Sequence, residues 1–237
     1  LASRISASTS GAPLIFENFA GLDAQKIFSG PFGDWGTLTM QFYLTRIDNK
    51  MRHPYFFEGE DDWELVTRIT NFNYTGLSNG QFNIKVGHFE IPFGLEAAIN
   101  SNGTLRQLMT GPNLGIKGDW GVSLNGVLEK IKYEVALTRG TGNEWHTDGD
   151  PFVVAGRIGT STDTEGFLGV PEYGISFFHG KVYGPPNPKK RTRIGVDGQW
   201  YFGPMGIMTE LSVGKDGEDE IINALAEINW HNPEESL

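Results

Sequence analysis

The sequence predicts an all-β fold, an antiparallel up-and-down β-barrel that crosses a membrane, and three observations lead to this prediction. Apolar and polar residues alternate with a period of two along much of the chain, whereas helical periodicity is hard to find. Several alternating segments have about 9–11 residues, the length that crosses a bilayer at the tilt of a barrel strand. Long polar connections and short turns alternate along the chain, as they do in membrane barrels.

The bulk composition limits the classes of protein that fit. The chain has 237 residues, which we take as a single β domain over 1–237. Its 19 basic and 29 acidic residues give a net charge of −10, which argues against a nucleic-acid partner. Because cysteine is absent, disulfides, thiolate metal sites and a cysteine nucleophile are excluded. The chain begins without methionine or a signal peptide, so we expect an internal fragment of a longer barrel.

About ten strands are expected from the alternation. In 130–138, for example, Ile131 and Val135 share one face, whereas Lys132 and Glu134 share the other. The clearest strands are 37–45, 113–126, 130–138 and 220–230. Less regular strands are expected at 63–75, 81–91, 153–160, 172–182, 191–202 and 206–214.

The connections between these strands differ in length. Asn79-Gly80 predicts a tight hairpin turn within 76–80, because such turns need a positive φ. Short turns are also expected at 125–129 and 203–205. Longer polar connections are expected at 48–62, 92–113, 139–152, 183–190 and 215–220, and 161–171 is of intermediate length. Connections that are long at one end and short at the other favour a membrane barrel over a soluble β-sandwich.

The composition of the two strand faces does not by itself separate a barrel from a soluble sheet. A sheet in lipid must close, because no water is present to satisfy the backbone groups of an open edge. A soluble surface β-sandwich that binds glycans therefore stays open as an alternative.

The stretch KVGHFEIPFGLE, residues 85–96, begins as a strand and then runs into a strand-breaking Pro-Phe-Gly. It resembles a strand end typical of the phosphate-selective porin O/P family of Gram-negative outer membranes. The matching residues are Val86, Gly87, Phe89, Pro92, Phe93 and Gly94. The segments 106–126 and 133–142 are similar to the strands that follow in that family. His88 and Glu90 depart from the pattern, since the family tends to place basic residues in this motif.

The resemblance implies a porin of about 16 strands, usually a trimer, of which this chain forms part. The expected function is passive diffusion of small ions or solutes through a water-filled lumen in the bacterial outer membrane. The expected partners are the lipid bilayer, lipopolysaccharide and the transported solutes, with a homotrimer as a further expectation and no cofactor. An alternative role for the same barrel is the sheath around a haem protein in a porin–cytochrome electron conduit.

Basic residues on the polar strand faces are candidates for the lining of the lumen. A charged side chain at mid-depth on the lipid side costs about 2–4 kcal/mol, so these residues should face water. An ordered set of such charges would govern ion preference. Scattered, solvated lumen residues are the alternative interpretation. The candidates are Arg68, Lys85, Lys117, Lys132, Arg157 and Arg193.

The connection 92–113 is the longest in the sequence. Pro92 lacks a backbone donor, so strand pairing should end there, and Gly94 permits a sharp change of direction. We expect this loop either to fold inward and narrow a pore or to lie outside the membrane.

No enzyme and no metal site are predicted. Ser176 and His179 lie three residues apart in one strand, on opposite faces, so they cannot pair as a catalytic couple. The five histidines form no array with metal-ligand spacing. The basic run 186–193 could bind lipopolysaccharide phosphates, although a solvated loop would look the same.

Overall fold

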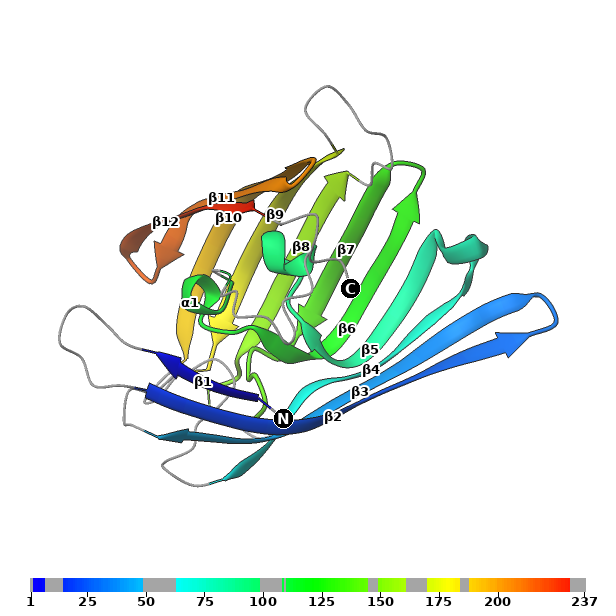
Figure 1. Cartoon of the computed structure of the whole chain (residues 1–237), viewed down its shortest axis with the longest axis horizontal. Coiled ribbons are helices and arrows are strands. Elements are labelled where there is room, and N and C mark those ends of the chain that lie inside the picture. Colours follow the sequence, from blue (N-terminus) through cyan, green and yellow to red (C-terminus); the bar gives the residue numbers. More distant parts are fainter. Residues whose placement is uncertain are drawn as a thin grey trace.

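The computed structural model describes residues 2–6, 15–48, 63–98, 108, 110–144, 149–160, 170–183 and 188–230. These residues form one sheet of 12 antiparallel strands, in which each strand pairs with the next one along the chain (Figure 1). The predicted all-β, antiparallel, up-and-down arrangement is therefore confirmed. Among the described residues the first and last strands do not pair with each other, so the sheet stays open.

The strands have the following bounds. They are β1 (Ala2–Ser6), β2 (Ile15–Gly30), β3 (Gly33–Asp48), β4 (Glu64–Leu77), β5 (Phe82–Glu90), β6 (Gly118–Leu128), β7 (Ile131–Thr138), β8 (Phe152–Thr160), β9 (Val170–Val182), β10 (Lys189–Phe202), β11 (Met205–Asp216) and β12 (Asp219–Trp230). Two short 3₁₀ helices, η1 (Ser78–Gly80) and η2 (Leu95–Ala97), and one short helix, α1 (Thr110–Leu114), lie in the connections. No helix in the described part of the chain is both long and apolar enough to cross a membrane.

Strands β1 and β2 were not predicted, and β2 and β3 are 16 residues long, which exceeds the expected length. In β2 the run Asp23-Ala24-Gln25-Lys26 places a polar residue on each face, so its own alternation is weak. The strand forms because it pairs with β3 over nearly its whole length. Together the two strands make a hairpin that reaches beyond its neighbours (Figure 1).

Two of the expected turns are confirmed and two connections were predicted wrongly. Asn79 and Gly80 have φ values of 53° and 82°, and Gly203 has a φ of 53°. The turn expected at 125–129 lies later, at Glu129 and the residue after it, because β6 stays paired as far as Leu128. The segment 215–220 is no long connection, since β11 and β12 pair up to Asp216 and Asp219. The expected connections at 48–62 and 161–171 lie largely outside the described residues.

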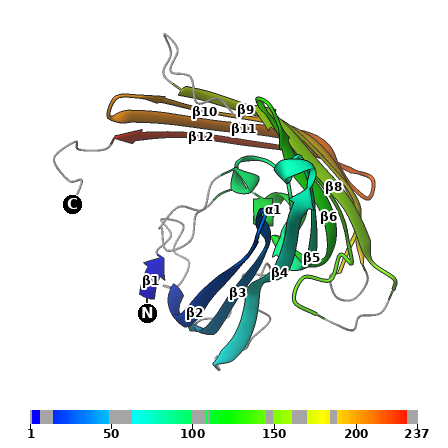
Figure 2. The ribbon, with the colours of Figure 1, turned by 90° about the vertical axis from the view of Figure 1, so that its right-hand side faces the viewer.

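The sheet curves around a hollow that holds the connection between β5 and β6 (Figure 2). Its two faces differ in the side chains that they present. In β6, Val122 and Leu124 are 43% and 44% exposed, whereas Ser123 between them is 2% exposed. The same alternation continues across β7 to β11. The convex face therefore carries a broad layer of exposed apolar side chains, and the polar residues face the hollow.

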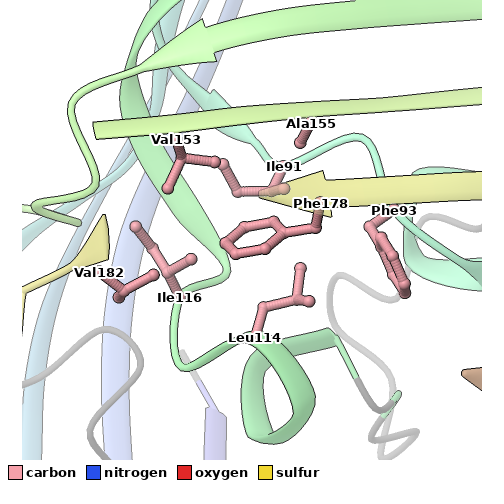
Figure 3. Packing of buried hydrophobic residues seen from close by; sticks show 8 residues of the cluster. All are labelled: Ile91, Phe93, Leu114, Ile116, Val153, Ala155, Phe178 and Val182. Carbon is pink, nitrogen blue, oxygen red and sulfur yellow. The ribbon is translucent and has the colours of Figure 1, made fainter. Parts of the chain in front are cut away.

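One apolar cluster is buried on the concave side. Four of its members, Ile91, Phe93, Leu114 and Ile116, come from the β5–β6 connection. They pack on β8 and β9 through Val153, Ala155, Phe178 and Val182 (Figure 3). This contact fixes the connection inside the curve of the sheet.

Candidate functional site

The Pro-Phe-Gly segment turns the chain from β5 onto the concave face. The Ile91 N–H donates to the Lys117 carbonyl at 2.8 Å, which joins the two arms of the connection. Gly94 then adopts a φ of 63°, and an added Cβ there would lie 2.2 Å from Glu210 Oε2. The Gly94 N–H donates to Ser176 Oγ at 3.0 Å. The backbone conformation therefore favours glycine, and a side chain at this position would displace the Glu210 carboxylate.

Glu210 supplies the next anchor. The Leu95 N–H donates to Glu210 Oε2 at 2.8 Å, and Leu95 itself is fully buried against Leu108 and Met208. A carboxylate that accepts a backbone N–H makes a strong, charge-assisted hydrogen bond. The start of η2 is thus fixed to β11 by a polar contact and an apolar one.

Asn113 fastens the other arm of the connection. Its Nδ2 donates to Ser212 Oγ at 2.7 Å, and its Oδ1 accepts from Arg193 Nε at 2.8 Å and from Asn223 Nδ2 at 2.7 Å. The Asn113 carbonyl accepts from Arg193 Nη2 at 3.1 Å. One amide side chain therefore connects α1 to β10, β11 and β12.

The six basic residues predicted to line a lumen all lie on the polar faces of their strands or in the inserted connection, and each is paired with a carboxylate. Arg68 Nη2 lies 3.1 Å from Glu90 Oε1, and Lys85 Nζ lies 2.8 Å from Glu134 Oε1. Lys117 pairs closely with Glu96 and lies 3.9 Å from Glu90. The acidic partners thus neutralise this half of the predicted set.

The other three basic residues are paired in the same way. Lys132 Nζ lies 3.8 Å from Glu172 Oε1, and Arg157 Nε donates to Asp197 Oδ2 at 3.0 Å. Arg193 Nη2 lies 2.6 Å from Asp216 Oδ1. The structure does not bring the six residues together at one point, because they are distributed over β4 to β10.

Sequence reasoning missed these pairings, and the register explains why. Glu134 stands directly opposite Arg157 in the β7–β8 ladder, yet its carboxylate contacts Lys85 on β5. Arg157 reaches across β9 to Asp197 on β10. The partners are two strands apart, so only the curvature of the sheet and the lean of the side chains select them.

The remaining residues of the Pro-Phe-Gly motif hold the local geometry. Gly87 has a φ of 129°, and a Cβ there would lie 2.2 Å from the Thr70 carbonyl oxygen. Phe89 and Phe93 are buried on the concave side, whereas Val86 is exposed on the convex face. Of the two departures from the family pattern, Glu90 is salt-bridged, and His88 is buried with Nδ1 2.8 Å from the Arg68 carbonyl oxygen.

A β-bulge brings Arg68 to this region. Gln41 pairs with Ile69, and Phe42 pairs with Thr67, which leaves Arg68 as an extra residue in β4. A bulge of this kind locally redirects a side chain. Arg68 thereby reaches Glu90 at the end of β5.

Glu96, the one acidic residue of the sequence between β5 and β6, is buried at 4% exposure. Burial raises the pKa of the Glu96 carboxyl, and the Lys117 ammonium opposes that shift. Its Oε1 pairs with Lys117, and its Oε2 is buried with no hydrogen-bond partner among the described residues.

A cavity of about 560 Å³ lies between the connection and strands β2 to β4. One side is formed by Glu90, Glu96 and the two alanines that follow it. The lining residues on the other side are Asp23, Ala24, Gln25, Thr39, Gln41 and Ile69. The connection therefore packs on one side of the concave face and leaves space at the other. No group of three or more metal-ligating side chains occurs in the part of the chain that the structure describes.

The fold is thus the curved antiparallel meander of a β-barrel wall, with a polar hollow and an inserted connection. No family model and no curated protein matches the chain. Among solved structures, three mutant forms of the Rh. blastica porin match over 96% of this chain and 95% of theirs. Their identity to this chain is 10%, and their TM-scores are 0.33, 0.31 and 0.31. Likeness at this level does not define a function.

Proposed function

We propose that the chain forms part of the wall of an outer-membrane porin, through whose water-filled lumen small ions and solutes diffuse passively. The observation that carries the proposal is the exposed apolar layer on the convex face. Ile175, Ile194 and Ile222 are 64%, 61% and 75% exposed, and residues of the same kind cover β3 to β12. In water such a layer is unfavourable, because exposed apolar area costs roughly 25 cal/mol per Å². In a bilayer the same layer meets lipid.

The polar side of the sheet supports the same proposal. Salt bridges such as Lys85–Glu134 and Lys132–Glu172 lie on the strand faces opposite the apolar layer. A protein that folds around an apolar core would have the reverse arrangement, with charged residues outward. The concave face fits a water-filled lumen along which Arg68, Lys85, Lys117 and Lys132 lie with their carboxylate partners, whereas Arg157 and Arg193 are buried in their ion pairs.

The open edges of the sheet call for further strands. An unpaired strand edge in lipid leaves backbone donors and acceptors without partners, so a membrane sheet has to close. We propose that additional strands complete a barrel of about 16 strands, as the resemblance to the O/P family implies. A trimer, contact with lipopolysaccharide and a place in the outer membrane belong to the same proposal.

The connection 92–113 is proposed to narrow the lumen. Its buried contacts with β8 and β9 and its hydrogen bonds to Ser176, Glu210 and Ser212 support an inward position over an external one. Part of it, 99–107 and residue 109, lies outside the described residues. Deleting 97–107 should raise single-channel conductance, and unchanged conductance would favour an external loop.

The two alternatives make different demands on the molecule. A glycan-binding sandwich needs two packed sheets, whereas the described residues form one sheet with its apolar face outward. A sheath around a haem protein would share the barrel, and a co-purifying cytochrome would identify it through its haem absorbance.

The test is a conductance measurement on the full-length protein that contains this chain. Purified in detergent and added to a planar bilayer, it should give stepwise, long-lived conductance increments. The same protein denatured beforehand serves as the control. A monodisperse protein that is soluble without detergent and gives no conductance would overturn the proposal.

A further inference from the structure

We infer that the passage left open beside the inserted connection prefers small cations over anions. The inference rests on the proposed porin function and adds a solute class to it. It depends on three features: the paired state of the basic residues on the concave face, the acidic lining of the cavity, and carboxylate oxygens that no cation neutralises.

The basic residues of the concave face are held by acidic partners. Arg157 and Arg193 are 8% and 1% exposed, so neither presents its charge to a passing ion. Their guanidinium groups are occupied by Asp197 and by Asp216 together with Asn113. A buried ion pair has little field at a distance, because the two charges cancel.

The lining of the cavity has the opposite character. Three carboxylates, Asp23, Glu90 and Glu96, line it, and no lysine or arginine is among the described lining residues. Two cations pair with these carboxylates: Arg68 binds Glu90, and Lys117 binds Glu96. The opening therefore has one carboxylate more than these cations can neutralise.

Asp23 carries that excess charge. It lies in the exposed part of β2, and its Oδ1 accepts a hydrogen bond from the neutral Tyr43 hydroxyl at 2.9 Å. On the opposite side of the cavity, Glu96 is buried and its charge is balanced by Lys117. The Asp23 wall of the opening thus presents carboxylate oxygens that a hydrated cation can approach, whereas the Glu96 carboxylate opposite is buried and paired with Lys117.

The physical consequence is a modest selectivity. A unit charge about 7 Å from the ion path changes the free energy of a monovalent ion. Even in water, this change is enough to alter the local concentration of that ion by a factor of about 3. Low-dielectric walls focus the field and increase the effect, whereas salt reduces it over a Debye length of about 10 Å at 0.1 M. A passage with these walls should admit K⁺ several times more readily than Cl⁻.

The experiment measures reversal potentials of the full-length channel in a KCl gradient. The wild type should give a K⁺/Cl⁻ permeability ratio of about 3 or more, and Asp23→Asn should lower it about two-fold. Asp23→Lys should bring the ratio below that of Asp23→Asn. Glu218→Gln removes the same charge from an exposed turn between β11 and β12 and serves as the matched control.

The outcomes separate the inference from the proposed function. A channel that conducts and prefers chloride overturns the cation inference and leaves the porin proposal standing. A channel whose ratio changes no more in Asp23→Asn than in Glu218→Gln also overturns the inference. A protein that gives no conductance in any form overturns the porin proposal itself. Native-like mobility of each variant on an unheated gel shows that its barrel is folded.

Discussion

The two sides of the concave face are built differently. Against β8 and β9 the inserted connection forms a dry contact, with Phe93 and Phe178 almost fully buried. Against β2 to β4 it leaves a cavity with polar walls. The connection is therefore asymmetric. Its contact with β8 and β9 holds it in place, and its other side, toward β2 to β4, borders the cavity. A substitution on the packed side should therefore change stability, and under the proposed porin function one on the open side should change ion permeation.

The largest effect is expected from Phe178→Ala. Truncation of a buried phenylalanine removes apolar contacts and leaves a cavity, which costs about 3–5 kcal/mol. Phe178 is 1% exposed and contacts both arms of the connection within its cluster. Urea unfolding in detergent, followed by tryptophan fluorescence, measures the loss.

Thr39→Ala is the matched control on the open side. Thr39 lines the cavity and is only half-buried, so its truncation should change the unfolding free energy by about 0.5 kcal/mol or less. Equal losses for Thr39→Ala and Phe178→Ala would show that the two sides do not differ as described.

An intermediate effect is expected from Asn113→Ala. The change removes the side-chain hydrogen bonds to Ser212, Arg193 and Asn223, and lost bonds to buried polar groups cost about 1–3 kcal/mol. The connection should loosen, so the open-channel current should become noisier and protease should cleave the loop faster. Asn223→Ala, which removes only one of these bonds, should give the smaller change. A quiet, protease-resistant Asn113→Ala channel would mean that the apolar cluster alone holds the loop.

The smallest effect concerns Glu96 and pH. Because burial raises its pKa above the ordinary value of 4.5, the folded chain keeps a proton that the unfolded chain has released in the window just above that value. Stability should therefore fall as pH rises from about 4.5 to the raised pKa. Glu96→Gln should flatten this part of the curve of unfolding free energy against pH. Identical slopes for wild type and Glu96→Gln would exclude this role for the carboxyl.

The sequence alone was enough to predict the strands whose two faces differ in polarity. β7, where Ile131 and Val135 alternate with Lys132 and Glu134, could be predicted from its pattern alone. β2 could not, because Asp23, Gln25 and Lys26 put polar groups on both faces and only pairing with β3 defines the strand. The same limit applies to the candidate site.

The sequence was enough to predict which basic residues lie on the polar face, but not which carboxylates pair with them. Local alternation placed Arg157 and Lys85 on the polar face, and the structure agrees. Their partners depend on which residues lie two strands away, and this is a property of curvature that no local pattern contains. The 215–220 segment shows a related limit, since its acidic composition resembled a long loop although Gly217, with a φ of 64°, makes a two-residue turn.

The anchors of the connection also have a consequence for the order of assembly. Gly94 bonds to a residue 82 positions later in the chain, and Leu95 bonds to one 115 positions later. Contacts between residues so far apart form slowly, because the loop-closure entropy has to be overcome first. Neighbouring hairpins such as β6–β7 can form early, but the Pro-Phe-Gly segment has nowhere to dock until β9 and β11 are in place. Insertion of the connection is therefore a late step of folding. The later strands must pair first, and the Pro-Phe-Gly segment, which precedes them in the sequence, then docks on their concave side.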